Sequence, residues 1–190
     1  MGERNLSKVF WSEALTGGLV LGIALFLWDL IGYWLNLPMA ASGFASVVQF
    51  ALLIAGIIYF SRRIRAFRGE SIGFPYGTAF GFIMAMMLFT GMIYGIGQYF
   101  LQVVIAPAYF NEVFEVTLWD SSFSEDLIEQ TLAMKQSPFM KNPVIYIFSG
   151  LFTMCIYGGL IGLIAAALMK RPANPFADHD NTENDYNPTF

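Results

Sequence analysis

The chain has 190 residues, of which 56% are hydrophobic and only 13% are charged. With a mean hydropathy of +0.57, it is too apolar to be a soluble domain, and the composition predicts a polytopic membrane protein of one domain. The formal net charge of −4 says little as a single number, because the charged residues are separated into different loops. The one cysteine, Cys155, lies in an apolar run, which excludes a disulfide framework and a cysteine-based metal site.

Four apolar segments are long enough to cross a bilayer, at about residues 12–35, 42–60, 75–106 and 144–169. A spanning helix needs ~20 apolar residues, so we predict an all-α fold in which residues 1–171 form a four-helix transmembrane bundle. The first segment exceeds the apolar core of a signal peptide and is followed by no small-residue cleavage site. We therefore expect it to be retained.

The basic residues predict the orientation of the bundle. The turn at 36–41 has no Lys or Arg, whereas a basic loop follows the second span and carries Arg62, Arg63, Arg65 and Arg68. Loops rich in Lys and Arg stay in the cytoplasm, so both termini should be cytoplasmic, which places eight of the ten basic residues inside. The four arginines could also attract anionic lipid headgroups, although a purely topological role is the favoured interpretation.

The connection at 107–143 is the only sizeable part expected outside the membrane, and it holds six acids and two lysines. Its apolar residues recur at helical spacing on both sides of Ser124, which predicts a short extracytoplasmic helical hairpin between spans three and four. We favour a structural cap over a gating lid. Residues 172–190 are acidic and contain prolines, so a disordered cytoplasmic tail is expected.

Small residues and amides share one face of the third span. Steps of three and four residues connect four glycines with both glutamines, Gln98 and Gln102, while Phe89 should face lipid. Because lipid tails solvate apolar side chains as well as protein does, close contact between membrane helices relies on small residues. The glycines predicted to pack between helices are Gly18, Gly22, Gly77, Gly81, Gly91, Gly95, Gly158 and Gly162.

Polar residues inside the spans form the candidate site. Asp29, Gln49 and Gln98 fall at a similar depth in three spans, and Gln102 continues the stripe of Gln98. One interpretation, which we favour, is that Gln49 and Gln98 hydrogen-bond Asp29 and fix the register of the helices, at ~0.6 kcal/mol per contact. The other is a substrate or proton site, because a carboxyl group inside a membrane is costly and often functional.

Other functions find little support in the residues. The third span's glycines follow an arginine-rich loop, which is the wrong context for a phosphate-binding loop. No span offers a histidine, and nothing except charge favours nucleic-acid binding. We therefore expect no metal, no cofactor, no nucleic-acid partner and no enzymatic activity.

Several short motifs resemble a known family. They are GESIGFPYGTAF at 69–80, Tyr94, IAPAYFNEVFE at 105–115 and GLIGLIAAALMKR at 159–171. These motifs are similar to those of the bacterial four-span membrane proteins named domain of unknown function 4199. The resemblance implies the bacterial inner membrane and no established activity. The resemblance also implies a genomic association, because such proteins are often encoded near membrane glycosyltransferases that act on polyprenyl-phosphate sugars.

Two hypotheses follow. The first is a non-enzymatic structural or accessory protein that packs with itself, as a homodimer, or with a membrane enzyme, in lipid-linked glycan or envelope metabolism. The alternative is a small carrier or lipid-linked-substrate translocator that uses the polar residues around Asp29. A dry interior would favour the first, and a polar cavity that reaches Asp29 would favour the second.

Overall fold

The fold is all-α and contains four helices long and apolar enough to cross a membrane, as predicted. The computed structural model describes residues 3–35, 39–68, 73–119, 124–137, 139 and 141–174. The long helices are α1 (Glu3–Trp34), α2 (Met39–Phe67), α4 (Tyr76–Tyr99), which continues into the π-helical η1 (Phe100–Ile105), and α7 (Pro143–Met169). Two short helices, α5 (Pro107–Trp119) and α6 (Glu125–Gln136), lie between η1 and α7.

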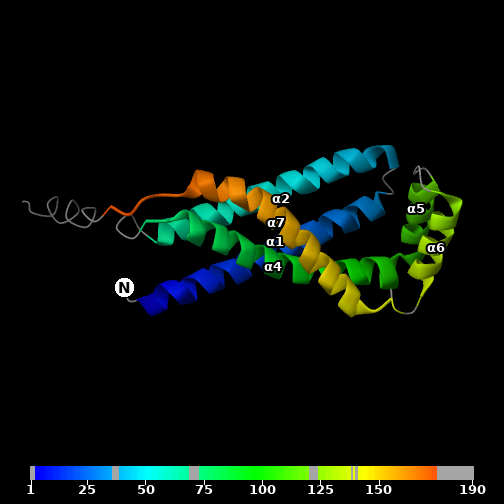
Figure 1. Cartoon of the computed structure of the whole chain (residues 1–190), viewed down its shortest axis with the longest axis horizontal. Coiled ribbons are helices and arrows are strands. Elements are labelled where there is room, and N and C mark those ends of the chain that lie inside the picture. Colours follow the sequence, from blue (N-terminus) through cyan, green and yellow to red (C-terminus); the bar gives the residue numbers. More distant parts are fainter. Residues whose placement is uncertain are drawn as a thin grey trace, which may run out of the picture.

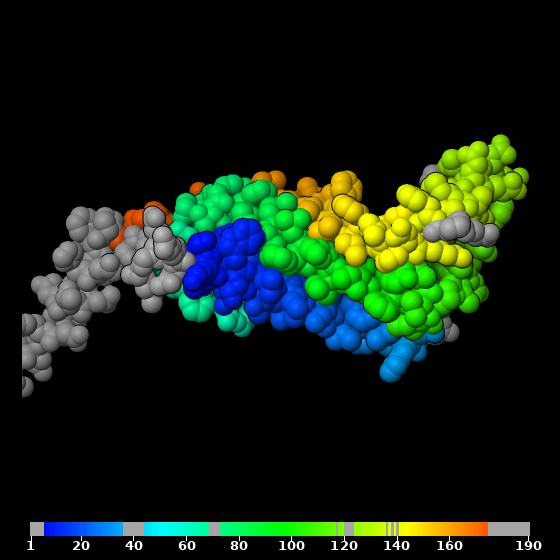
Figure 2. All heavy atoms as spheres, turned by 90° about the horizontal axis from the view of Figure 1, so that it is seen from below, coloured from blue at the N-terminus to red at the C-terminus, as the bar shows by residue number. Residues whose placement is uncertain are grey.

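The long helices run side by side in alternating directions (Figure 1). The start of α1, the end of α2 and the end of α7 lie at one end of the bundle, and α5 and α6 lie at the other (Figure 1). In the space-filling view, the molecule is elongated, with the yellow-green segment of α5 and α6 projecting at one end (Figure 2). The end of the bundle that holds the end of α2, with its arginines, is called the arginine end. The opposite end is called the α5–α6 end.

Helix α4 is the centre of the bundle because it packs extensively against both α1 and α7. Its side chains Phe82, Ile83, Met86 and Met87 are completely buried. The outward faces of the other long helices remain apolar, for example at Phe152, which is 70% exposed on α7. Apolar residues on the outside suit a protein whose solvent is lipid, where packing rather than water exclusion holds the helices together. Phe89, predicted to face lipid, is instead partly buried against this core.

Local signals explain where the helices begin. Asn142 lies just before α7, and its side-chain oxygen accepts a hydrogen bond of 3.0 Å from the Val144 amide, with Pro143 in the first turn. Before α4, Gly73 has φ +71°, a conformation that suits glycine. Phe74 then exchanges two backbone hydrogen bonds of 2.8 Å with Arg171, which joins the start of α4 to the end of α7.

The prediction of a basic loop after residue 60 has to be corrected. Helix α2 runs seven residues beyond the predicted end at 60, so Arg62, Arg63 and Arg65 are helical and only Arg68 follows the helix. Arginine is a good helix former, and no glycine or proline interrupts the segment. Arg63 forms an ion pair of 3.0 Å with Glu13 of α1, and Arg68 donates to the Gly73 carbonyl at 3.1 Å. Two of the four arginines are therefore engaged within the protein.

Two other predictions fall partly or wholly on undescribed residues. Residues 36–38 of the first turn and residues 175–190 of the acidic tail lie outside the described part of the chain. The connection predicted to form a hairpin contains a contact between α5 and α6. Lys135 of α6 donates from its amine to the Phe110 carbonyl of α5 at 3.2 Å. The same amine lies 3.8 Å from the centre of the Phe114 ring.

Candidate functional site

Asp29 on α1 is the centre of a hydrogen-bonded group between α1 and α4. The Tyr94 hydroxyl donates to its Oδ2 at 2.9 Å, and Gln98 Nε2 donates to the same oxygen. Tyr94 and Gln98 lie one turn apart on α4, so both reach a single carboxylate oxygen from one helix face. Two donors from α4 thus hold Asp29, which lies five residues before the end of α1 at Trp34.

The group extends in both directions from Asp29. Gln49 of α2 donates to the Tyr94 hydroxyl at 3.3 Å, and Gln102 of η1 donates to Gln98 Oε1 at 2.7 Å. We call these five residues the Asp29 cluster; all five are partly buried. Next to it, the Trp28 indole donates to the Ala45 carbonyl at 3.1 Å, which adds a bond between α1 and α2.

The structure brings together all four residues of the predicted site and adds a fifth. Gln49 was expected to bond Asp29 directly, but it reaches Asp29 through the Tyr94 hydroxyl. Sequence reasoning did not assign Tyr94 to the site, although it lies four residues before Gln98 and eight before Gln102. That i, i+4, i+8 series of polar side chains on one helix face was the available signal.

The arrangement supplies hydrogen-bond partners to a carboxyl group between two helices. Among the described residues, no group of three His, Cys, Asp or Glu side chains is placed to hold a metal ion. A carboxyl group in apolar surroundings requires hydrogen-bond donors, and Tyr94 and Gln98 provide two. The cluster joins α1, α2 and the α4–η1 span at one level.

Comparison with known families matches residues 16–171 to the family described as "Protein of unknown function (DUF4199)". The chain belongs to this family. The match includes every member of the Asp29 cluster, the first span from residue 16 onward and the other three spans completely. No curated protein and no solved structure matches the chain.

The glycines of this family member differ in what they contact. A Cβ atom at Gly91 would lie 2.7 Å from Leu151 Cα, and one at Gly95 would lie 2.5 Å from the Tyr146 carbonyl oxygen. Gly150 faces them across the contact, where its own Cβ would lie 2.5 Å from the Gly91 carbonyl oxygen. Helices α4 and α7 therefore touch backbone to backbone here, which only small residues permit.

The other predicted glycines fall into two groups. Gly18 and Gly22 of α1 pack against α4, and Gly158 and Gly162 of α7 pack against α4 from the other side. Gly77 and Gly81 do not pack within the described chain: both are exposed, and a Cβ at either would meet nothing within 4 Å. The prediction that they contact another helix of the same bundle is wrong: α7 meets the α4 backbone at Gly91 and Gly95, whereas beside Gly81 it meets the side chains of Phe80 and Ile83.

A small cavity borders the Asp29 cluster between α2, α4 and α7. Its volume is about 160 Å³, and its lining includes the polar residues Ser46, Gln49, Tyr94, Thr153 and Tyr157. Asp29 itself does not line it. The cavity thus reaches the partners of the carboxyl group but not the carboxyl group.

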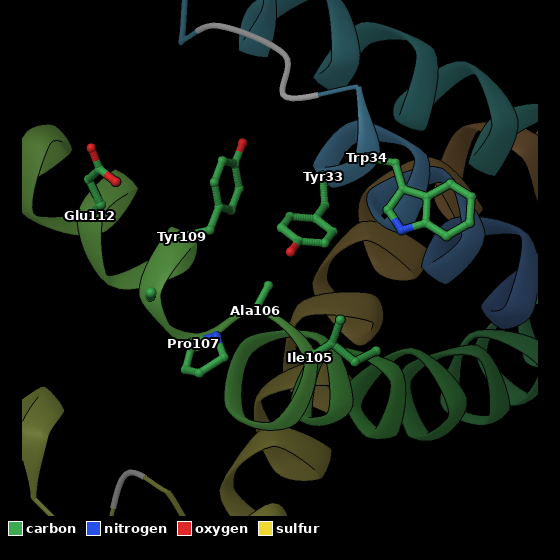
Figure 3. Close-up of a pocket in the computed structure, with 8 residues that line it drawn as sticks. Tyr33, Trp34, Ile105, Ala106, Pro107, Tyr109 and Glu112 are labelled. Atoms are coloured by element: carbon green, nitrogen blue, oxygen red, sulfur yellow. The ribbon is translucent and has the colours of Figure 1, made fainter.

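A larger hollow of about 630 Å³ lies where the end of α1 meets the start of α5 (Figure 3). Tyr33 and Tyr109 approach one another there, with ring centres 5.3 Å apart (Figure 3). Among the described residues that line it, Glu112 is the only ionisable one besides these two tyrosines. Tyrosine and tryptophan are common at membrane interfaces, which accounts for this hollow without a ligand.

Proposed function

We propose that this protein is a non-enzymatic structural or accessory membrane subunit that packs with itself or with a membrane partner. The observation that supports this proposal is the internal bonding of the Asp29 cluster, in which Asp29 accepts from Tyr94 and Gln98. Interhelical hydrogen bonds of this kind contribute ~0.6 kcal/mol each and fix how helices align. In this proposal the partly buried polar side chains hold the bundle together, and contacts with a partner are made by the outer surface.

The surface that we propose for the partner is the arginine-end half of α4. Gly77 and Gly81 are exposed one turn apart, with open space where a side chain would be. Such a face allows another helix to approach closely. We propose that a second copy or a membrane enzyme of envelope or lipid-linked glycan metabolism packs there.

Purification of the tagged full-length protein in mild detergent tests this role. We expect the wild type to elute as an oligomer or with a captured membrane protein, and Gly81→Leu to lose that association without a loss of thermal stability. Gly159→Leu is the matched control, because Gly159 on α7 has equally open space around it. A monomeric wild type without any captured protein, or a Gly81→Leu variant with full capture, would contradict the proposal.

The second candidate function is a small carrier that uses Asp29. The observation that favours it is the cavity of about 160 Å³ bordered by Gln49 and Tyr94. Polar side chains from three helices line this cavity, and they could bind a small polar substrate or pass a proton along a relay. This alternative predicts that a residue unable to ionise at position 29 abolishes function in a protein that still folds.

We also propose that the arginine end faces the bacterial cytoplasm and that α5 and α6 lie outside. Support comes from the basic residues, eight of ten of which belong to the termini and the α2 end. Reporter fusions after Arg68 and after Asp120 test it. The Arg68 fusion should report the cytoplasm and the Asp120 fusion the opposite side; a cytoplasmic Asp120 fusion would reverse the assignment.

A further inference from the structure

Two neighbouring hollows at the α5–α6 end differ in character. One, of about 300 Å³, lies among η1, α5, α6 and the start of α7, and includes Lys135, Lys141 and Asn111. The other, of about 420 Å³, includes the apolar side chains Phe114, Met134 and Ile145. Three residues, Gln102, Lys135 and Tyr146, line both, so the two hollows adjoin.

The charges near these hollows are sorted by sign. Lys135 and Lys141 are the only lysines between α5 and α7, and both line the first hollow. The acids of α5 and α6 line neither hollow, and each is exposed: Glu112, Glu115, Glu125, Asp126 and Glu129. The first hollow is therefore a basic spot within an acidic pair of helices.

Lys135 is held in place but its charge is not neutralised by an ion pair. Its amine donates to the Phe110 carbonyl and lies over the Phe114 ring, and within the described residues no carboxylate lies within 4.0 Å of it. Burial lowers the pKa of the Lys135 amine, and the more distant Glu115 carboxylate opposes that effect. An anion beside this amine would compensate its partial loss of water.

The apolar hollow leads towards lipid. Ile145 and Ser149 line it one turn apart on α7, and the neighbouring Phe148 and Phe152 are 67% and 70% exposed. A hydrocarbon chain placed in this hollow could continue along α7 in the direction of the bilayer core. The η1 turn contributes Gln102 to both hollows, and π-helical turns of this kind are frequent at functional sites.

We propose that this double hollow binds one bilayer lipid with an anionic phosphate headgroup, with the phosphate between Lys135 and Lys141 and an acyl chain against Phe114, Met134 and Ile145. The headgroup side offers two ammonium groups together with the Asn111 amide. The site would hold a lipid of the leaflet at the α5–α6 end. The site shares Gln102 with the Asp29 cluster, but its two lysines belong neither to that cluster nor to the Gly77 and Gly81 face, so changes at the lysines test this inference separately from the accessory role.

Lipid binding to the purified full-length protein in detergent tests the proposal. The probes are dioleoyl phosphatidylglycerol, dioleoylglycerol, which has the same chains without the phosphate, and inorganic phosphate. We expect one tightly held phosphatidylglycerol, visible by native mass spectrometry, no retention of dioleoylglycerol, and no competition by millimolar inorganic phosphate. Equal retention of dioleoylglycerol, or full displacement by inorganic phosphate, would overturn the lipid assignment.

Variants locate the site. Lys141 is exposed and lies outside the helices, so Lys141→Gln should not disturb folding, and we expect it to weaken phosphatidylglycerol binding roughly fivefold. Lys135→Met should weaken binding at least as much, whereas Lys135→Arg should keep most of it. Lys170→Gln, at the arginine end, is the matched control and should bind as the wild type does. Wild-type affinity in Lys141→Gln and Lys135→Met would overturn the proposal.

Discussion

The two halves of α4 carry the same spacing of glycines but use them differently. Gly91 and Gly95 lie against the backbone of α7, whereas Gly77 and Gly81, on the same stripe, face open space. The difference arises because α7 crosses α4 and touches it backbone to backbone only near Gly150. A glycine stripe therefore marks where close approach is allowed, and the crossing point decides where it occurs.

Gly95→Leu should disrupt the close contact between α4 and α7, and we expect it to lower stability more than any of the variants described below. Its side chain would meet the Tyr146 carbonyl oxygen at 2.5 Å and Ile147 Cα at 2.8 Å, and backbone atoms cannot yield cheaply. Overpacking typically costs about 1–3 kcal/mol, and more where backbone must move. We expect a marked fall in the thermal unfolding temperature in detergent.

Gly81→Leu is the matched control for that variant. It introduces the same side chain on the same helix with nothing within 4 Å of the first added atom, and leucine favours helix over glycine by about 1 kcal/mol. Its unfolding temperature should equal or exceed that of the wild type. Equal losses in Gly81→Leu and Gly95→Leu would show that the crossing point is misplaced.

The next effect concerns the polar contact between α1 and α4. Asp29→Leu leaves the Tyr94 hydroxyl and the Gln98 amide without their acceptor, which should cost about 1–3 kcal/mol of stability. Asp29→Asn keeps a side-chain oxygen that can accept from either donor. Abundance in membranes and unfolding temperature should therefore fall in the leucine variant and stay near wild type in the asparagine variant; the reverse order would contradict the hydrogen-bonded joint.

The smallest effect is expected where the cluster reaches α2. Tyr94→Phe removes the hydroxyl that donates to Asp29 and accepts from Gln49, and each such interhelical bond is worth about 0.6 kcal/mol. Tyr59→Phe serves as the control, because Tyr59 is 60% exposed on the outside of α2. We expect a small decrease in unfolding temperature for Tyr94→Phe and none for Tyr59→Phe. Identical unfolding curves for the two variants would show that the Tyr94 hydroxyl does not help to hold the helices together.

The sequence predicted the four helices well, because long apolar segments and glycine stripes depend on composition and helical period alone. It also placed Asp29, Gln49 and Gln98 at one level, since depth follows from counting residues along each span. The identity of the direct partners was less accessible. Tyr94 ranks as apolar in a hydropathy pattern, so its hydroxyl was overlooked between Asp29 and Gln49.

The end of α2 and the crossing of α7 over α4 show two other limits of what the sequence can predict. Arginines mark where a span leaves the lipid but do not end a helix, so Arg62 and Arg65 continue α2. Which glycines meet a neighbour depends on the angle between two helices, a tertiary property that the pattern of one helix does not contain. Gly81 and Gly95 are equivalent in the stripe and differ only in the assembled bundle.

Complementation of a deletion strain by Asp29→Asn, with membrane abundance measured in parallel, tests the central claim most directly. That claim is that the Asp29 cluster holds the helices together and carries no proton or substrate. Asparagine keeps the size and an acceptor oxygen for Tyr94 and Gln98 but cannot ionise. We predict wild-type abundance with full complementation. An abundant, folded Asp29→Asn protein that fails to complement would contradict the account and favour the carrier.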